Sequence, residues 1–85
     1  MVIIIYDVAT LRARRRAERL LREASFVFLF GNVRWTRQPV DKCALLRRLR
    51  STLRGEAFRI VVLDVPNRSM DAARWLHGSV AKETK

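Results

Sequence analysis

The sequence is poor in the residues that staple or anchor small proteins, with one cysteine, one histidine, two prolines and three glycines among 85 residues. A lone cysteine, Cys43, excludes a disulfide within the chain, and the single histidine, His77, leaves no Cys and His cluster for zinc. No apolar run approaches the roughly 20 residues that a membrane span requires. We therefore expect a cytoplasmic domain that folds without disulfide, zinc or membrane anchor.

Acidic residues are also scarce, because 8 Asp and Glu stand against 18 Lys and Arg, which gives a formal net charge of +10. Fifteen of the 18 basic residues are arginine, whose planar guanidinium matches phosphate oxygens in pairs. This bias indicates a nucleic-acid partner, although a solvated basic surface is the alternative. A chain this short buries only about 60% of its unfolded surface, so we also expect a homo-oligomer.

The first half of the chain predicts a strand, a helix and two further strands. The β-branched and aromatic run 2–8 is typical of a central strand. Thr10 can cap a helix in which alanine and leucine recur at three- and four-residue spacing as far as Ala24. Residues 26–30 and 33–37 predict two strands joined by the hairpin signal Gly31-Asn32, with a single long bent strand as the alternative.

The second half predicts one more helix and one more strand. Pro39 suits the first turn of a helix with an apolar stripe, and Gly55 marks its end. The stripe consists of Leu45, Leu46, Leu49 and Leu53. Residues 58–65 predict the last strand, which ends before Pro66. For residues 69–77, local propensity favours a short helix, and an additional strand is the alternative.

This order of elements predicts an α+β fold of the ferredoxin-like βαββαβ type, with a four-stranded antiparallel sheet and both helices on one face. We assign residues 1–78 to this single domain and residues 79–85 to a basic C-terminal tail. Phe26, Phe28 and Phe30 alternate onto one face of the sheet. We expect them to pack in the core, whereas a base-stacking platform would indicate an RNA-binding domain.

Asp7 is the candidate site residue, because it is an acid at the end of a buried strand in a strongly basic chain. An ion pair with Arg12 or Arg15 is one interpretation, and a Mg²⁺ site is the other. The second strand acid, Asp64, should lie at the opposite end of the sheet, roughly 20 Å away, since the first and last strands of this fold run antiparallel. One carboxylate is a small ligand set for Mg²⁺, and a symmetric dimer would add a second by bringing two copies of Asp7 together.

The chain resembles the Cas-two family of small CRISPR-associated adaptation proteins over nearly its full length. The resemblance lies in the opening strand that ends in Tyr6-Asp7, the arginine-rich helix that runs into Leu20-Leu21, the segment 28–33 and the strand 58–63. By its position in this pattern, the segment 73–78 resembles the family's fifth strand, which is exchanged with a partner subunit. The Ser and Phe that nuclease-active members often carry in the third strand are not found around residues 31–35.

The resemblance implies a homodimeric adaptor for spacer acquisition, which scaffolds the CRISPR integrase subunit and holds duplex protospacer DNA. The arginines that match the family's phosphate-contacting cluster are Arg12, Arg14, Arg15, Arg16 and Arg19. The alternative that it implies is a Mg²⁺-dependent endonuclease that cleaves RNA or DNA, with Asp7 from each subunit as metal ligand and catalytic residue. A small RNA-binding domain is the third hypothesis.

Overall fold

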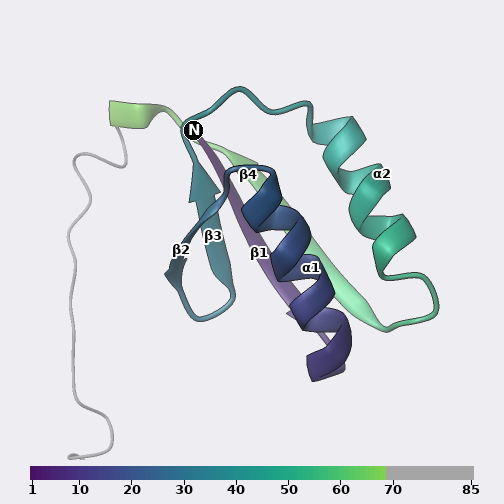
Figure 1. Ribbon diagram of the computed structural model, residues 1–85. Helices are drawn as coiled ribbons and strands as arrows, with labels where there is room; N and C mark the ends of the chain where they lie inside the picture. The colour runs from purple at the N-terminus through teal and green to yellow at the C-terminus, as the bar shows by residue number, and fades with distance from the viewer. Residues whose placement is uncertain (69–85) are drawn as a thin grey trace, which may run out of the picture.

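The computed structural model describes residues 1–68; the predictions for 69–77, the domain boundary at 78 and the tail lie outside this range. The elements follow one another in the predicted order (Figure 1). They are β1 (Val2–Val8), α1 (Leu11–Glu23), β2 (Val27–Phe30), β3 (Val33–Thr36), α2 (Lys42–Thr52) and β4 (Phe58–Asp64). No helix of the described residues is long and apolar enough to cross a membrane.

The four strands form one antiparallel sheet in the order β2-β3-β1-β4, and both helices lie on the same face of it (Figure 1). The predicted α+β, ferredoxin-like arrangement is therefore confirmed. β1 pairs with β4 along its whole length, from Val2 opposite Asp64 to Val8 opposite Phe58. This register places Asp7 and Asp64 at opposite ends of the sheet, as predicted.

α1 begins and packs as its sequence predicts. The Oγ1 atom of Thr10 accepts a hydrogen bond from the backbone N–H of Ala13 at 3.2 Å, which satisfies one of the free donors of the first turn. The helix buries Ala13, Ala17, Leu20 and Leu21, whose spacing places them on one side. The other arginines of α1 are consequently left on its outer surface, whereas Arg14 is half-buried.

α2 begins later than predicted, since Asp41 rather than Pro39 sets its start. The Oδ1 atom of Asp41 accepts a hydrogen bond from the N–H of Ala44 at 3.0 Å, so the helix starts at Lys42 and Pro39 lies in the preceding loop. Leu45 and Leu49 are buried on the inner side of the helix. The prediction for Leu46 is wrong, because this side chain is 41% exposed.

The hairpin between β2 and β3 confirms the two-strand prediction over the single bent strand. Phe30 stands opposite Val33, and Gly31 adopts a positive φ of 50° in the two-residue connection. The predicted core packing is correct for Phe26, which is 1% exposed, and wrong for Phe28 and Phe30, which are 58% and 54% exposed. A register shift between Phe28 and Phe30 breaks the alternation, and β2 is an edge strand.

Candidate dimer surface and nucleic-acid interface

Among residues 1–68, the helices cover one face of the sheet and leave the other face open. On β1 the side chains of Val2, Ile4 and Tyr6 are buried beneath the helices. Because side chains alternate along a strand, Ile3, Ile5 and Asp7 belong to the other face. No helix of the described residues lies on that second face (Figure 1).

Apolar side chains from all four strands make up this open sheet face. The register sets Ile5 between Val33 and Val61, and it sets Ile3 between Trp35 and Leu63. The full set is Ile3, Ile5, Val27, Phe30, Val33, Trp35, Val61 and Leu63. Five of these side chains are between 40% and 54% exposed. An apolar patch that spans a whole sheet in so small a domain is typical of a protein interaction surface.

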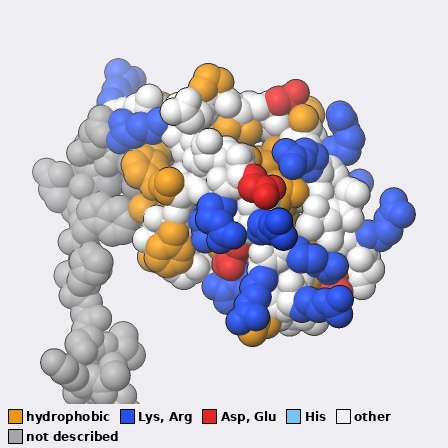
Figure 2. Space-filling view, in the orientation of Figure 1, with side chains coloured by type: hydrophobic (Ala, Val, Ile, Leu, Met, Phe, Trp, Pro, Cys, Tyr) orange, Lys and Arg blue, Asp and Glu red, His pale blue; other side chains and the backbone are white. Residues whose placement is uncertain are grey.

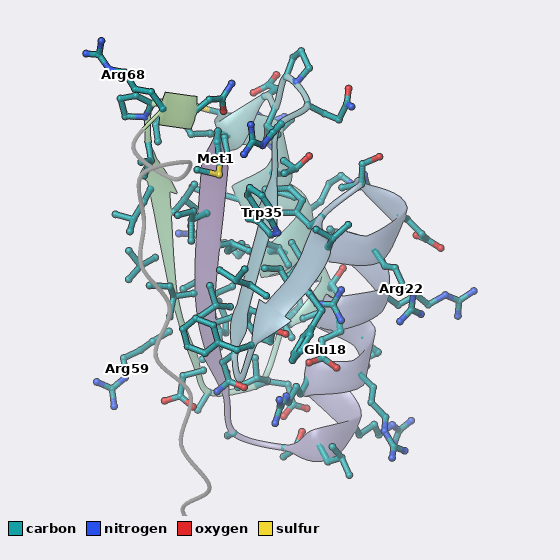
Figure 3. All side chains as sticks on the ribbon, turned by 90° about the vertical axis from the view of Figure 1, so that its left-hand side faces the viewer. Met1, Glu18, Arg22, Trp35, Arg59 and Arg68 are labelled. Atoms are coloured by element: carbon teal, nitrogen blue, oxygen red, sulfur yellow. The ribbon has the colours of Figure 1, made fainter. Side chains whose placement is uncertain are left out.

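Asp7 lies on the open sheet face at the end of β1, and its side chain is exposed. Within residues 1–68 it forms no ion pair with Arg12 or Arg15, so that interpretation is wrong. The basic residue opposite it is Arg59 of β4, whose side chain points away from the helices (Figure 3). Asp7 therefore borders the apolar patch, on the side of the sheet that α1 does not reach.

Asp7 also lines a shallow pocket of about 200 Å³, together with Ala9, Ala57, Phe58 and Arg59. Magnesium prefers several oxygen ligands, usually one or two carboxylates with water or phosphate. In this pocket Asp7 is the only carboxylate and Arg59 competes for it, and no group of three metal-ligating side chains occurs in the described part of the chain. The residues of one protomer do not fit a Mg²⁺ site unless a second copy contributes its Asp7.

The five predicted phosphate contacts on α1 fall into two groups. Three of them form ion pairs within the chain: Arg14 with Glu18 at 3.1 Å, Arg16 with Glu56 at 3.7 Å and Arg19 with Glu23 at 3.5 Å. Arg12 and Arg15 are exposed and form no ion pair with any described residue. These two keep their full charge for an external anion, whereas the other three share it with a carboxylate.

Basic side chains dominate the outer surface of the helix layer. In the view onto the helices, Lys and Arg side chains are spread over α1 and α2 with few acidic groups among them (Figure 2). Between Lys42 and Gly55 the chain has no acidic residue and four arginines, Arg47, Arg48, Arg50 and Arg54. Residues 1–68 thus present an apolar surface on one side of the sheet and a cationic surface on the other.

A hydrogen-bonded network that the sequence analysis missed connects β1, α1 and β3. The hydroxyl of Tyr6 donates to Oε2 of Glu18 at 2.8 Å, the Nε of Arg14 donates to the same oxygen at 3.1 Å, and the Nε of Arg34 donates to Tyr6 Oη at 3.4 Å. Glu18 turns from α1 toward the sheet, whereas Arg22 points the other way (Figure 3). The only signal in the sequence is a polar Tyr6 at a position whose alternation predicts burial.

The network shifts the ionisation of both of its acids. Burial raises the pKa of Tyr6, and the carboxylate of Glu18 adds to this effect while Arg34 opposes it. Burial also acts to raise the pKa of Glu18, but the hydrogen bonds from Tyr6 and Arg14 outweigh it and hold that pKa below its usual value. Glu18 therefore stays ionised at neutral pH and fixes α1 against the sheet.

Asp64, the second strand acid, has a local partner. Nζ of Lys42 lies 2.7 Å from its Oδ2, and this hydrogen bond lowers the pKa of Asp64 and raises that of Lys42. The pair ties the start of α2 to the end of β4. Asp64 consequently takes no part in the surface around Asp7.

Comparison with known proteins adds no family to these observations: no family model matches the chain, and no curated protein matches it. The functional argument therefore depends on the fold, the two contrasting surfaces and the position of Asp7.

Proposed function

We propose that the protein is a homodimeric nucleic-acid-binding adaptor of CRISPR adaptation, similar to the Cas-two family. In this role the dimer scaffolds the integrase subunit and holds duplex protospacer DNA on its basic surface. The observation that carries the proposal is the division of the surface into an open apolar sheet face and an arginine-covered helix layer. The ferredoxin-like fold and the Tyr6-Asp7 ending of β1 agree with the resemblance.

The open sheet face supports the homodimer. We take a second copy of the chain as its occupant, because a twofold axis would cover both apolar faces at once and would leave both helix layers free. Cross-strand packing across such an interface would remove the exposed parts of Ile5, Val61 and Leu63 from water. The same axis would bring the two copies of Asp7 to one interface, at the border of the apolar patch.

The helix layer supports nucleic-acid binding. Arg12 and Arg15 carry charges that no described carboxylate neutralises, and binding of phosphates to such side chains releases counterions from the nucleic acid. Contacts of this kind position a duplex and carry no sequence information. We therefore expect tight, salt-sensitive binding that depends little on base sequence.

A Mg²⁺-dependent endonuclease is the second candidate, favoured by the exposed position of Asp7 beside the surface assigned to the dimer. If two copies of Asp7 held the ion, it would activate water for attack on a phosphodiester. The single carboxylate and the adjacent Arg59 favour the adaptor instead. A small RNA-binding domain is supported less, because Phe28 stacks against its own Arg34 at 5.8 Å.

The experiment that tests the proposal measures binding of duplex DNA against salt concentration and, on the same preparation, cleavage with and without Mg²⁺. The adaptor predicts a steep salt dependence with intact DNA, and it predicts that Asp7→Asn binds as well as the wild type or more tightly, since a negative charge is lost. Cleavage that requires Mg²⁺ and disappears in Asp7→Asn would make the protein a nuclease. Binding of single-stranded RNA in preference to the duplex would favour the third hypothesis.

A further inference from the structure

A groove runs along α2 and the loop that follows it, and arginine is the most frequent of the residues that line it. Its main part has a volume of about 420 Å³ and is lined by Arg47, Arg50, Ser51 and Arg54 together with Leu53, Gly55, Glu56 and Phe58. A second hollow of about 340 Å³ adjoins it through Arg47 and Arg50 and extends to Cys43 and Leu46. We call these two hollows the α2 groove.

The arginines of the α2 groove are free to bind an external anion. Among residues 1–68, no carboxylate lies within ion-pair distance of Arg47, Arg50 or Arg54. The only acidic residue that lines the groove is Glu56, and it is already engaged by the α1 end of the molecule: its Oε1 accepts from Thr10 at 3.2 Å, and Arg16 lies 3.7 Å from its Oε2. The groove therefore combines three uncompensated guanidinium groups with the hydroxyl of Ser51.

The spacing of these groups suits a phosphodiester chain. Arg47 and Arg50 are three residues apart and hence neighbours on one side of the helix, about 4.5 Å apart along its axis. One strand of a duplex carries a charge about every 3.4 Å along its axis, so the two side chains can reach successive phosphates. Each guanidinium can also hold two phosphate oxygens at once.

We propose that the α2 groove is a second binding site for the phosphate backbone of nucleic acid, in addition to the arginines of α1. This inference rests on the proposed nucleic-acid-binding function and extends it to α2, which contains none of the residues that carry the resemblance. The groove also borders the pocket of Asp7, because Phe58 lines both. A backbone held along α2 is thereby continuous with the end of the sheet where Asp7 lies.

The test compares two double variants that remove the same charge from exposed positions. Arg47/Arg50→Gln empties the groove of two cations. Arg37/Arg68→Gln is the matched control, because both side chains are exposed and lie outside the helix layer, after the ends of β3 and β4. Equal urea unfolding midpoints would establish that both variants are folded.

Binding of a random-sequence DNA duplex is then measured at several salt concentrations. Loss of two phosphate contacts reduces the slope of log K against log salt by about 1.8 and weakens binding by about 60-fold at about 0.1 M salt. We expect this loss for Arg47/Arg50→Gln and a slope close to that of the wild type for Arg37/Arg68→Gln. Equal losses in the two variants, or wild-type affinity in Arg47/Arg50→Gln, would overturn the site while nucleic-acid binding stands. Wild-type protein that shows no salt-dependent binding would overturn the proposed function as well.

Discussion

A charge placed on the open sheet face, at Val61 of the edge strand β4, should dissociate the dimer. Val61 is 49% exposed in the isolated chain, and complete burial of a valine side chain stabilises by about 1.5–3 kcal/mol. Burial of the exposed half of Val61 should therefore stabilise the dimer by about 1 kcal/mol for each copy, or about 2 kcal/mol for a symmetric pair. Val61→Lys removes this gain and also places a charged ammonium group in an apolar interface, which costs several kcal/mol more.

The combined loss of at least about 4 kcal/mol corresponds to a dimer Kd about 1000-fold weaker. Sedimentation velocity over a range of protein concentrations measures this shift. Leu11→Lys is the matched control, since Leu11 is 60% exposed at the start of α1 and the substitution adds the same charge on the other side of the molecule. A monomeric wild type, or equal dissociation of both variants, would refute the assignment of this face.

Two further predictions concern the stability of the fold. Tyr6→Phe should cost about 1.5 kcal/mol at neutral pH, because it removes a buried hydrogen bond to the charged Glu18. The pKa of Glu18 in the folded state lies below its unfolded value, so this contribution is complete above the unfolded pKa and is lost as pH falls through the folded pKa. Urea unfolding at pH values above and below the folded pKa should show that the stability lost in Tyr6→Phe becomes smaller in acid. A loss of stability that does not change with pH would contradict the network. Leu49→Ala should cost about 2–5 kcal/mol at a 1% exposed position, whereas Leu46→Ala at a 41% exposed position of the same helix should cost much less; similar unfolding midpoints for the two variants would contradict the packing of α2.

Local signals in the sequence were sufficient to predict β1 and α1. The run Val2–Val8 is apolar on both faces, and Thr10 is followed by small and apolar residues at helical spacing, so both elements have the predicted bounds to within a residue. The hairpin followed equally from Gly31-Asn32. Each of these features depends on neighbouring residues and on no distant contact.

Features that depend on a choice between two local signals, or on tertiary structure, were predicted less well. Pro39 and Asp41 are both good helix starters, and the side-chain hydrogen bond of Asp41 decides between them. The exposure of Phe30 results from an irregularity in the pairing of β2 with β3, which no residue pattern marks. The partner of Asp7 also required the register, because Arg59 is 52 positions away in the chain and comes opposite Asp7 only through the pairing of β1 with β4.

The candidate site was predicted in its residue types and only partly in its geometry. The sequence indicates an arginine-rich surface and an isolated Asp7, and both are present. It does not indicate which arginines are neutralised, since the ion pair of Arg16 with Glu56 joins residues far apart in the chain. For this reason the arginines of α2, which form no ion pair with any carboxylate of residues 1–68, were recognised as a candidate site only in the structure.

The most direct test of the central claim, a dimer that holds duplex DNA on its basic surface, is the mass of the protein and of its complex with a short duplex, measured by size-exclusion chromatography with light scattering at low and at high salt. The account predicts two chains in the free protein, two chains on the duplex at low salt, and release of the intact duplex from an unchanged dimer at high salt. A single chain in the free protein and on the duplex, or a complex that high salt leaves intact, would contradict it.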